Sequence, residues 1–158
     1  MGYYLTGQVC LNGHPITNDA SSGLSQRFCS KCGAETITHC PNCKSPIHGK
    51  YDVPGIVVFG SSYTPDAYCY NCGEPYPWTE AAINNTILLI QEDEELSDSL
   101  KGSLVSSLPD VITETPGTNL AVVRMKKALK TAGKFTADAL RQFAIDFGCE
   151  LARKSLGL

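Results

Sequence analysis

The spacing of the cysteines constrains the fold of this chain more than any other feature. Seven of its eight cysteines lie within the first 72 residues, and six of these form three C-x-x-C pairs. The seventh lies four residues before a histidine, so the ligand pairs are Cys10/His14, Cys29/Cys32, Cys40/Cys43 and Cys69/Cys72. Eight such ligands are enough to close two tetrahedral zinc sites. A site closed by four protein ligands is structural, because it leaves no position for water or substrate.

The residues that follow the cysteine pairs support tight metal-binding turns. Such a turn needs a residue with positive φ just after the second ligand, and glycine adopts this conformation without steric cost. Gly33 and Gly73 occupy that position in two of the pairs, and Gly13 lies within the first pair. Lys44 occupies it in the Cys40/Cys43 pair, which is therefore a less favourable turn.

A disulfide framework is the alternative interpretation of eight cysteines, and it is typical of small secreted domains. The chain opens with MGYYLTGQVC, which has neither a basic segment nor an apolar segment of the kind found in secretory signals. Cys149 stands alone in a helical pattern, as expected of a reduced core residue. We therefore predict two structural zinc ions and a cytoplasmic protein.

Two groupings of the four ligand pairs are open. The sequential grouping places Cys10, His14, Cys29 and Cys32 on one ion and Cys40, Cys43, Cys69 and Cys72 on the other. The crossed grouping joins the first pair to the third and the second to the fourth. The longer segments 15–28 and 44–68 can each form a hairpin within a sequential site, so we favour that grouping. His39 and His48 are left as spare imidazoles.

The pattern of the chain predicts an α+β protein with two small zinc-ribbon β units followed by a C-terminal α-helical domain. The ribbons are expected over 1–78, the first over 1–38 and the second over 39–78. Short strands are predicted at 3–9, 24–28 and 34–38, and the clearest strand is Gly55–Phe59, between Pro54 and Gly60.

The helical domain is expected over 79–158. Thr79 is a suitable N-cap, and Glu80 suits the first turn of a helix. The acidic run 92–95 predicts a break between two helices, and Pro109 predicts the end of the second. A linker is expected at about 109–119, and Gly133 is expected to separate or kink the last helices.

Two apolar stripes predict which faces of the last helices are buried. One consists of Leu120, Val123, Leu129 and Ala132. The other consists of Leu140, Phe143, Phe147 and Leu151.

Charge is distributed unevenly along the chain. Residues 1–78 carry four Lys/Arg and five Asp/Glu (net −1), 79–118 carry one and eight (net −7), and 119–158 carry eight and three (net +5). Solvated helix faces account for this pattern most simply, and pairing between acidic and basic helices is the alternative. The longest apolar run of the helical part, 87–90, is far short of the roughly 20 residues of a membrane span.

The motifs of the N-terminal half resemble those of a bacterial family of unknown function built on tandem zinc ribbons. The likeness is carried by GYY at 2–4, VCLNGH at 9–14, FCSKCG at 28–33, CPNC at 40–43 and YCYNCGEPYPW at 68–78. It implies two structural zinc ions and a bacterial, cytoplasmic protein, and it implies no activity. The turns are also similar to the knuckles of rubredoxin-type and zinc-ribbon domains, which bind proteins and nucleic acids alike.

Three classes of function remain open. The first is a protein-interaction or scaffold module in a bacterial assembly, for which the aromatic residues Tyr63, Tyr68, Tyr70, Tyr76 and Trp78 offer either interface anchors or a small core. The second is nucleic-acid binding, which the slightly acidic N-terminal half disfavours because phosphate contacts dominate such affinity. The third is an enzyme, for which the sequence shows neither a phosphate-binding loop nor a defensible nucleophile and base. We expect the first, with an unidentified protein partner or self-association, with nucleic acid as a further possible partner, and with no catalytic residues.

Overall fold

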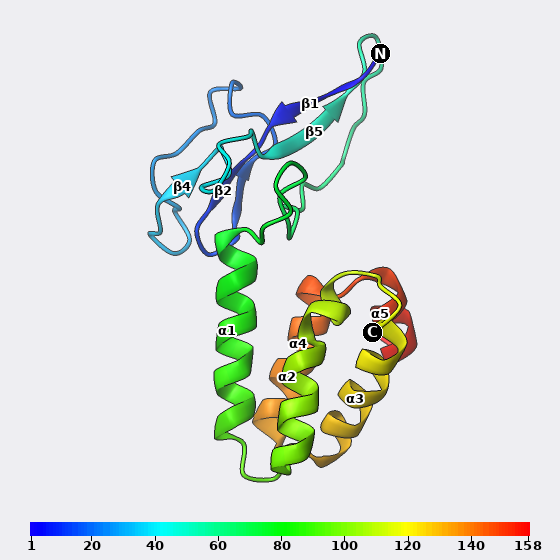
Figure 1. The fold of residues 1–158 in the computed structure, drawn as a ribbon. Coiled ribbons are helices and arrows are strands. Elements are labelled where there is room, and N and C mark those ends of the chain that lie inside the picture. The colour runs from blue at the N-terminus through cyan, green and yellow to red at the C-terminus, as the bar shows by residue number, and fades with distance from the viewer. The chain divides into compact units, whose positions relative to one another are not determined.

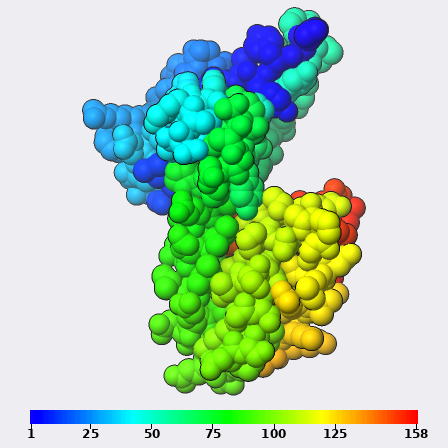
Figure 2. All heavy atoms as spheres, in the orientation of Figure 1, coloured from blue at the N-terminus to red at the C-terminus, as the bar shows by residue number.

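The computed structural model describes residues 1–158 and divides into two compact units, Met1–Glu80 and Ala81–Leu158. The first unit carries all of the strands and the second is helical (Figure 1), so the α+β class is confirmed. In the space-filling view the first unit runs from blue to green and the second from green to red (Figure 2).

Five short strands form two sheets in the first unit. Strands β1 (Tyr3–Thr6) and β5 (His48–Asp52) make an antiparallel pair. Strand β2 (Gln8–Cys10) lies between β3 (Pro15–Thr17) and β4 (Thr36–Ile37), and both neighbours are antiparallel to it. Strand β2 is fully buried, so it is the centre of this small unit.

Backbone pairing links the two predicted ribbons. Tyr3 of β1, in the first predicted ribbon, pairs with Asp52 of β5, which follows Cys43 in the second. The Gly7 N–H donates to the Ile47 carbonyl at 2.8 Å, and the Ile47 N–H donates to the Thr38 carbonyl at 2.9 Å. Residues 1–38 and 39–78 therefore share hydrogen-bonded backbone and one buried side chain, Ile47, which is fully inaccessible to solvent.

Two of the predicted strands are wrong. Residues 55–59 form an exposed loop, because Gly55 and Gly60 both adopt positive φ and no neighbouring strand pairs with the run. The strand of this region is β5, which precedes it and has the partner β1. Residues 24–28 contribute only an isolated bridge between Phe28 and Glu35. In both places the availability of a partner outweighs the β propensity of the segment.

Five helices follow: α1 (Pro77–Glu92), α2 (Asp98–Ile112), α3 (Thr118–Thr131), α4 (Lys134–Phe147) and α5 (Glu150–Leu156). The predicted breaks at the acidic run and at Gly133 are confirmed, since they separate α1 from α2 and α3 from α4. The core of the helical unit is formed chiefly by Leu104, Leu108, Val111, Met125 and Leu140, all of which are fully buried.

The structure corrects the predicted helix limits. Helix α1 begins at Pro77, a favourable first position for proline, so Thr79 is not its N-cap. Helix α2 continues past Pro109 to Ile112, and only residues 113–117 connect it to α3. Burial of Val111 and Ile112 offsets the backbone hydrogen bond that proline removes, and Pro109 itself is exposed.

The predicted stripe on α3 is the wrong face. Leu120 and Val123 are about half exposed, and the helix instead buries Thr118, Ala121, Val122, Met125 and Ala128. This face also has helical spacing, and its alanines allow close packing against neighbouring helices. The second stripe is split, because α4 ends at Phe147 and Leu151 belongs to α5.

Cys149 is the N-cap residue of α5 rather than a residue within a helix. It is half-buried, and its backbone N–H donates to the Val111 carbonyl at 2.9 Å. None of the five helices combines the length and the apolar character required to cross a membrane.

Candidate metal centres

Each C-x-x-C pair lies on the same kind of turn. The N–H of the first cysteine donates to the carbonyl five residues later, and its own carbonyl accepts from the N–H four residues later. The two bonds of each turn measure 2.8 and 2.8 Å at Cys29, 2.8 and 2.9 Å at Cys40, and 2.9 and 2.9 Å at Cys69. These bonds fix the backbone so that both sulfurs of a pair point in one direction.

The residue after the second cysteine has positive φ in all three turns, as predicted. The angle is 74° at Gly33, 75° at Gly73 and 66° at Lys44. Lys44 is the one residue other than glycine with positive φ, and its Nζ donates to the Pro41 carbonyl at 2.9 Å. This hydrogen bond links the two ends of the turn. It offsets part of the steric cost of a positive φ, which is about 1–2 kcal/mol for a residue with a Cβ.

The Cys10/His14 pair lies on a related turn that follows strand β2. The Cys10 N–H donates to the His14 carbonyl at 3.0 Å, and the His14 N–H donates to Cys10 Sγ at 3.3 Å. Gly13 has a φ of 92°, and a Cβ there would lie only 2.9 Å from Trp78 Cβ. The position therefore requires glycine both for its backbone angle and for its contact with Trp78.

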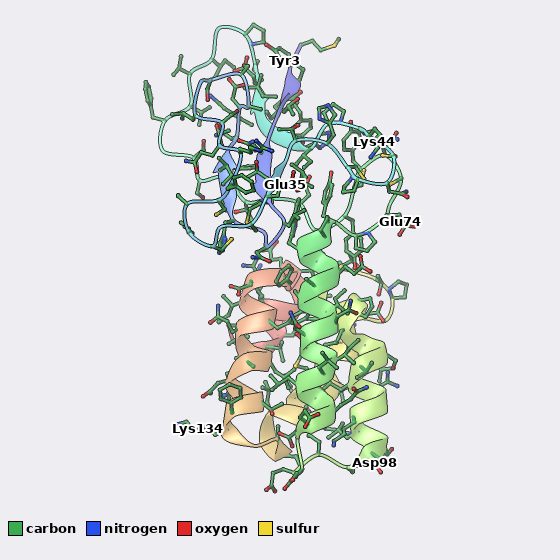
Figure 3. All side chains as sticks on the ribbon, turned by 90° about the vertical axis from the view of Figure 1, so that its left-hand side faces the viewer. Tyr3, Glu35, Lys44, Glu74, Asp98 and Lys134 are labelled. Carbon is green, nitrogen blue, oxygen red and sulfur yellow. The ribbon has the colours of Figure 1, made fainter.

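The structure brings the eight residues together in the sequential grouping. Cluster 1 consists of Cys10, His14, Cys29 and Cys32, and cluster 2 consists of Cys40, Cys43, Cys69 and Cys72. Within each cluster the ligand atoms all lie within 4.8 Å of one another. Figure 3 labels Lys44 and Glu74, which mark the two loops that carry cluster 2. Each cluster can thus hold one metal ion, and the crossed grouping is not the one that forms.

The distances in cluster 2 match the edges of a tetrahedron around a metal. With metal–sulfur bonds of about 2.3 Å, tetrahedral geometry separates two sulfurs by about 3.8 Å. Cys40 Sγ and Cys72 Sγ are 3.8 Å apart, and Cys43 Sγ and Cys69 Sγ are 3.6 Å apart. A disulfide would bring two sulfurs to about 2.05 Å. All eight cysteines are free thiols, so the disulfide interpretation does not describe this structure.

Cluster 1 has the same dimensions with one nitrogen ligand. Cys10 Sγ and Cys32 Sγ are 3.7 Å apart. His14 Nδ1 lies 3.4 Å from Cys10 Sγ and 3.7 Å from Cys29 Sγ. A metal–nitrogen bond of about 2.0–2.1 Å beside a metal–sulfur bond predicts a separation of roughly 3.5 Å. The donor sets therefore fit a tetrahedral ion at both clusters.

Hydrogen bonds lower the pKa of Cys32 in cluster 1 and of Cys43 and Cys69 in cluster 2, which favours binding as thiolates. The Ala34 N–H, followed by the Asn12 side chain, lowers the pKa of Cys32 to about 6. The Asn12 Nδ2 lies 3.4 Å from Cys32 Sγ. The side chain and N–H of Ser45 lower the pKa of Cys43 to about 5. Burial instead raises the pKa of Cys40 to about 11, so an ion is needed to hold that side chain deprotonated at neutral pH.

Sequence reasoning did not identify Asn12 and Ser45 as partners of the ligands. Both lie within two residues of a ligand, and they belong to the residue types that favour turns. The spare histidines take no part in either cluster. His39 Nδ1 lies 2.9 Å from Thr38 Oγ1, and the His48 ring stacks between two tyrosines.

A buried tyrosine lies beside cluster 2. Tyr76 is 1% exposed, and its hydroxyl makes no hydrogen bond within the chain. Burial, followed by interaction with the Cys69 thiol, raises the pKa of Tyr76 well above its ordinary range. Its ring stacks on Trp78 at 4.7 Å, so these two aromatics are core residues rather than surface anchors. The Trp78 Nε1 donates to the Asp66 carbonyl at 3.0 Å.

A comparison with protein-family profiles shows to which family the chain is related. The profile of a family described as an uncharacterised protein conserved in bacteria, DUF2321, matches residues 3–156. The chain belongs to this family. The match spans residues of both units, so the family profile includes the helical segment as well as the cysteine motifs. Searches of curated proteins and of solved structures found no match.

Proposed function

We propose that each cluster binds one zinc ion and that both ions are structural. Four protein ligands at each cluster fill a tetrahedral coordination sphere and leave no open position for substrate. Structural zinc contributes on the order of 10 kcal/mol to the folding of small metal-binding units. The first unit has short strands and many exposed residues, so this contribution is the main source of its order.

Metal analysis of the purified chain tests this proposal. Two zinc ions per chain, with no visible thiolate-to-metal charge-transfer band, are expected. Tetrahedral sulfur sites also suit iron, which would colour the protein. One ion per chain, or iron in cluster 2, would contradict the proposal.

We further propose that the metal-held unit is a non-enzymatic protein-interaction module within a bacterial assembly. The observation that carries this proposal is an exposed apolar loop, Ile56–Phe59, in which all four side chains are at least 55% exposed. Strands β1 and β5 add the half-exposed rings of Tyr3, Tyr4 and Tyr51. Contiguous exposed apolar surface is uncommon on monomeric proteins, and aromatic residues are favoured as interface anchors.

Site-specific photo-crosslinking tests the interaction. A photoreactive amino acid would replace Phe59 in a bacterium that encodes the family, and Lys31, an exposed polar residue of the same unit, would serve as the matched control position. A discrete cross-linked partner is expected from position 59 and not from position 31. Substituting Val57→Ser in the same chain should weaken that product. Equal labelling at both positions would contradict an interface at this loop.

Nucleic-acid binding is the alternative, favoured only by the kinship of the knuckles with zinc ribbons. The first unit is slightly acidic, with four Lys/Arg against five Asp/Glu over residues 1–78. Tight binding of single- or double-stranded nucleic acid that weakens steeply with salt would support this alternative over the protein interface.

A further inference from the structure

A cavity of about 400 Å³ lies beside strand β5 in the first unit. It is bounded by residues 48–51 of β5, by Tyr4 of β1, by Asn18 and, in the following loop, by Val58, residues 61–64 and Asp66. None of its lining residues is a member of either metal cluster. Its volume falls in the range of small-molecule sites, about 300–1,000 Å³.

One part of the lining carries hydrogen-bond donors that have no partner within the chain. The side chains of Lys50, Ser61, Ser62 and Thr64 line the cavity and make neither a hydrogen bond nor an ion pair. Ser61, Ser62 and Thr64 are exposed, so water satisfies their hydroxyls in the free protein. With the Lys50 ammonium they can donate to a ligand rich in acceptors, and the positive charge of Lys50 favours an anion.

The lining holds one cation, Lys50, and one carboxylate, Asp66, so the preference for an anion is local to Lys50. Asp66 is the carboxylate of the lining, and its Oδ2 lies 3.8 Å from His48 Nδ1. The Asp66 carboxylate thus lies beside the His48 imidazole. The Lys50 ammonium, in contrast, has no carboxylate partner. The Tyr63 hydroxyl is already used, since it donates to the His48 carbonyl at 2.9 Å.

Another part of the lining is aromatic or apolar. Tyr4 and Tyr51 are each half exposed, and their rings meet edge to face with centroids 5.0 Å apart. Val58 lies on the same lining. Exposed ring surface of this kind favours the planar, weakly polar part of a ligand, because contact with it removes apolar area from water.

We propose that this cavity binds a small anion joined to a planar ring, for which a nucleoside monophosphate is the representative probe. Lys50 and the hydroxyls of Ser61, Ser62 and Thr64 bind the anionic group, and Tyr4 and Tyr51 contact the ring. A nucleic-acid strand fits less well, because the unit carries a net charge of −1 over residues 1–78 and lacks a basic track for further phosphates. The site shares Tyr4, Tyr51 and Val58 with the proposed protein interface. Its test uses a small ligand and no protein partner, so the two proposals can fail separately.

The test is a titration of the metal-loaded full chain, labelled with ¹⁵N, with adenosine 5′-monophosphate. Chemical-shift changes are expected at the amides of Lys50, Ser61, Ser62 and Thr64. Adenosine and inorganic phosphate, titrated separately, should each bind at least about tenfold more weakly, because each lacks one of the two contacts. Lys50→Gln should weaken binding of the monophosphate by about tenfold or more, and Lys50→Arg should retain it. Lys126→Gln, a change in the helical unit, should have no effect.

Several results would overturn the proposal. They are the absence of shifts around the cavity at millimolar ligand, an unchanged affinity in Lys50→Gln, or equal affinities for adenosine and the monophosphate. Equal affinities for phosphate and the monophosphate would overturn the ring contact. Binding of a thymidine oligonucleotide that is tighter than binding of the monophosphate and weakens steeply with salt would also overturn the proposal. It would identify a nucleic-acid strand, rather than a small molecule, as the ligand.

Discussion

The rings of His48 and Tyr70 lie parallel, with centroids 3.9 Å apart and planes inclined by 10°. Tyr4 stacks on the opposite face of His48 at 3.8 Å, so three rings form one column. Tyr70 lies between Cys69 and Cys72, whereas Tyr4 and His48 belong to the β1–β5 sheet. The column therefore connects the second metal cluster to the sheet through side chains.

Removing the end of this column should destabilise the first unit without releasing metal. We expect Tyr70→Ala to lower the free energy of unfolding by about 1 kcal/mol, the usual contribution of an aromatic pair. Tyr3→Ala is the matched control, because Tyr3 is 54% exposed against 53% for Tyr70 and makes no ring contact. Denaturant unfolding and metal analysis check the prediction. Equal losses in the two variants, or loss of an ion from Tyr70→Ala, would show that the column does not act as described.

Cysteine substitutions should report how the ligands are shared. Cys40→Ser and Cys72→Ser belong to one cluster, so each alone and both together should cost one ion of two. Cys29→Ser combined with Cys72→Ser should cost both ions, because the residues belong to different clusters. Cys149→Ser should retain both, since Cys149 lies at the start of α5 in the helical unit. Metal content of each purified variant is the measurement.

Loss of one ion should also affect the rest of the unit. Strand β1 belongs to residues 1–38, which carry cluster 1. It pairs with β5, which belongs to residues 39–78, the part that carries cluster 2. We therefore expect Cys72→Ser to broaden or shift the amide signals of Tyr3, Tyr4 and Thr6 as well as those of its own knuckle. Unchanged β1 signals would mean that the two segments fold independently.

The metal clusters could be predicted from the sequence because their geometry is local. A C-x-x-C turn needs only a few hydrogen bonds and one residue with positive φ, and all of these lie within six residues of chain. Gly33 and Gly73 marked such turns, and Lys44 was correctly identified as the exception. Spacing favours the sequential grouping but does not determine it. The grouping depends on the path that residues 15–28 and 44–68 take between the ligand pairs.

Elements that depend on distant partners could not be predicted in the same way. Residues 55–59 have the composition of a strand, but β1 pairs with the more polar β5 instead. Pro109 is a local signal to end a helix, yet burial of Val111 and Ile112 extends α2 beyond it. Helix α3 has apolar residues on more than one face, and packing selects Met125 and the alanines over Leu120. In each case tertiary contacts outweigh the local preference.

Two glycine substitutions should have opposite effects. Gly73 has a φ of 75°, and a Cβ there meets no atom within 4 Å, so Gly73→Ala incurs a backbone cost without a clash. We expect it to destabilise the first unit by about 1 kcal/mol. Gly102 lies within α2 in open space and has no positive φ, so Gly102→Ala should stabilise the helical unit by up to about 1 kcal/mol. Thermal unfolding of the two variants checks both signs. A stabilising Gly73→Ala would contradict the turn geometry.

Asp93 joins two helix connections in the helical unit, a role that the acidic run 92–95 did not predict. Its Oδ1 accepts from the N–H groups of Glu95 and Leu96 at 2.8 and 3.0 Å, before α2 begins. Its Oδ2 accepts from the Gly133 N–H at 3.0 Å, between α3 and α4. Burial raises the pKa of Asp93, but bonds from Thr136 and these three N–H groups outweigh it, so the net pKa is lowered.

The lowered pKa determines how stability should vary with pH. The Asp93 carboxylate binds its proton less readily in the folded chain than in the unfolded chain, where its pKa is about 3.9. Its contribution is therefore complete above that value and is lost as the pH falls through the folded pKa. We expect Asp93→Asn to lower the unfolding free energy of the helical unit by about 2 kcal/mol at pH 7, with a much smaller difference near pH 2. Asp138→Asn is the control, since Asp138 pairs only with the exposed Arg141 and such pairs contribute little. Denaturant unfolding followed by helix circular dichroism measures both variants. A difference that stays constant with pH would show that packing, rather than the charge of Asp93, holds the two connections.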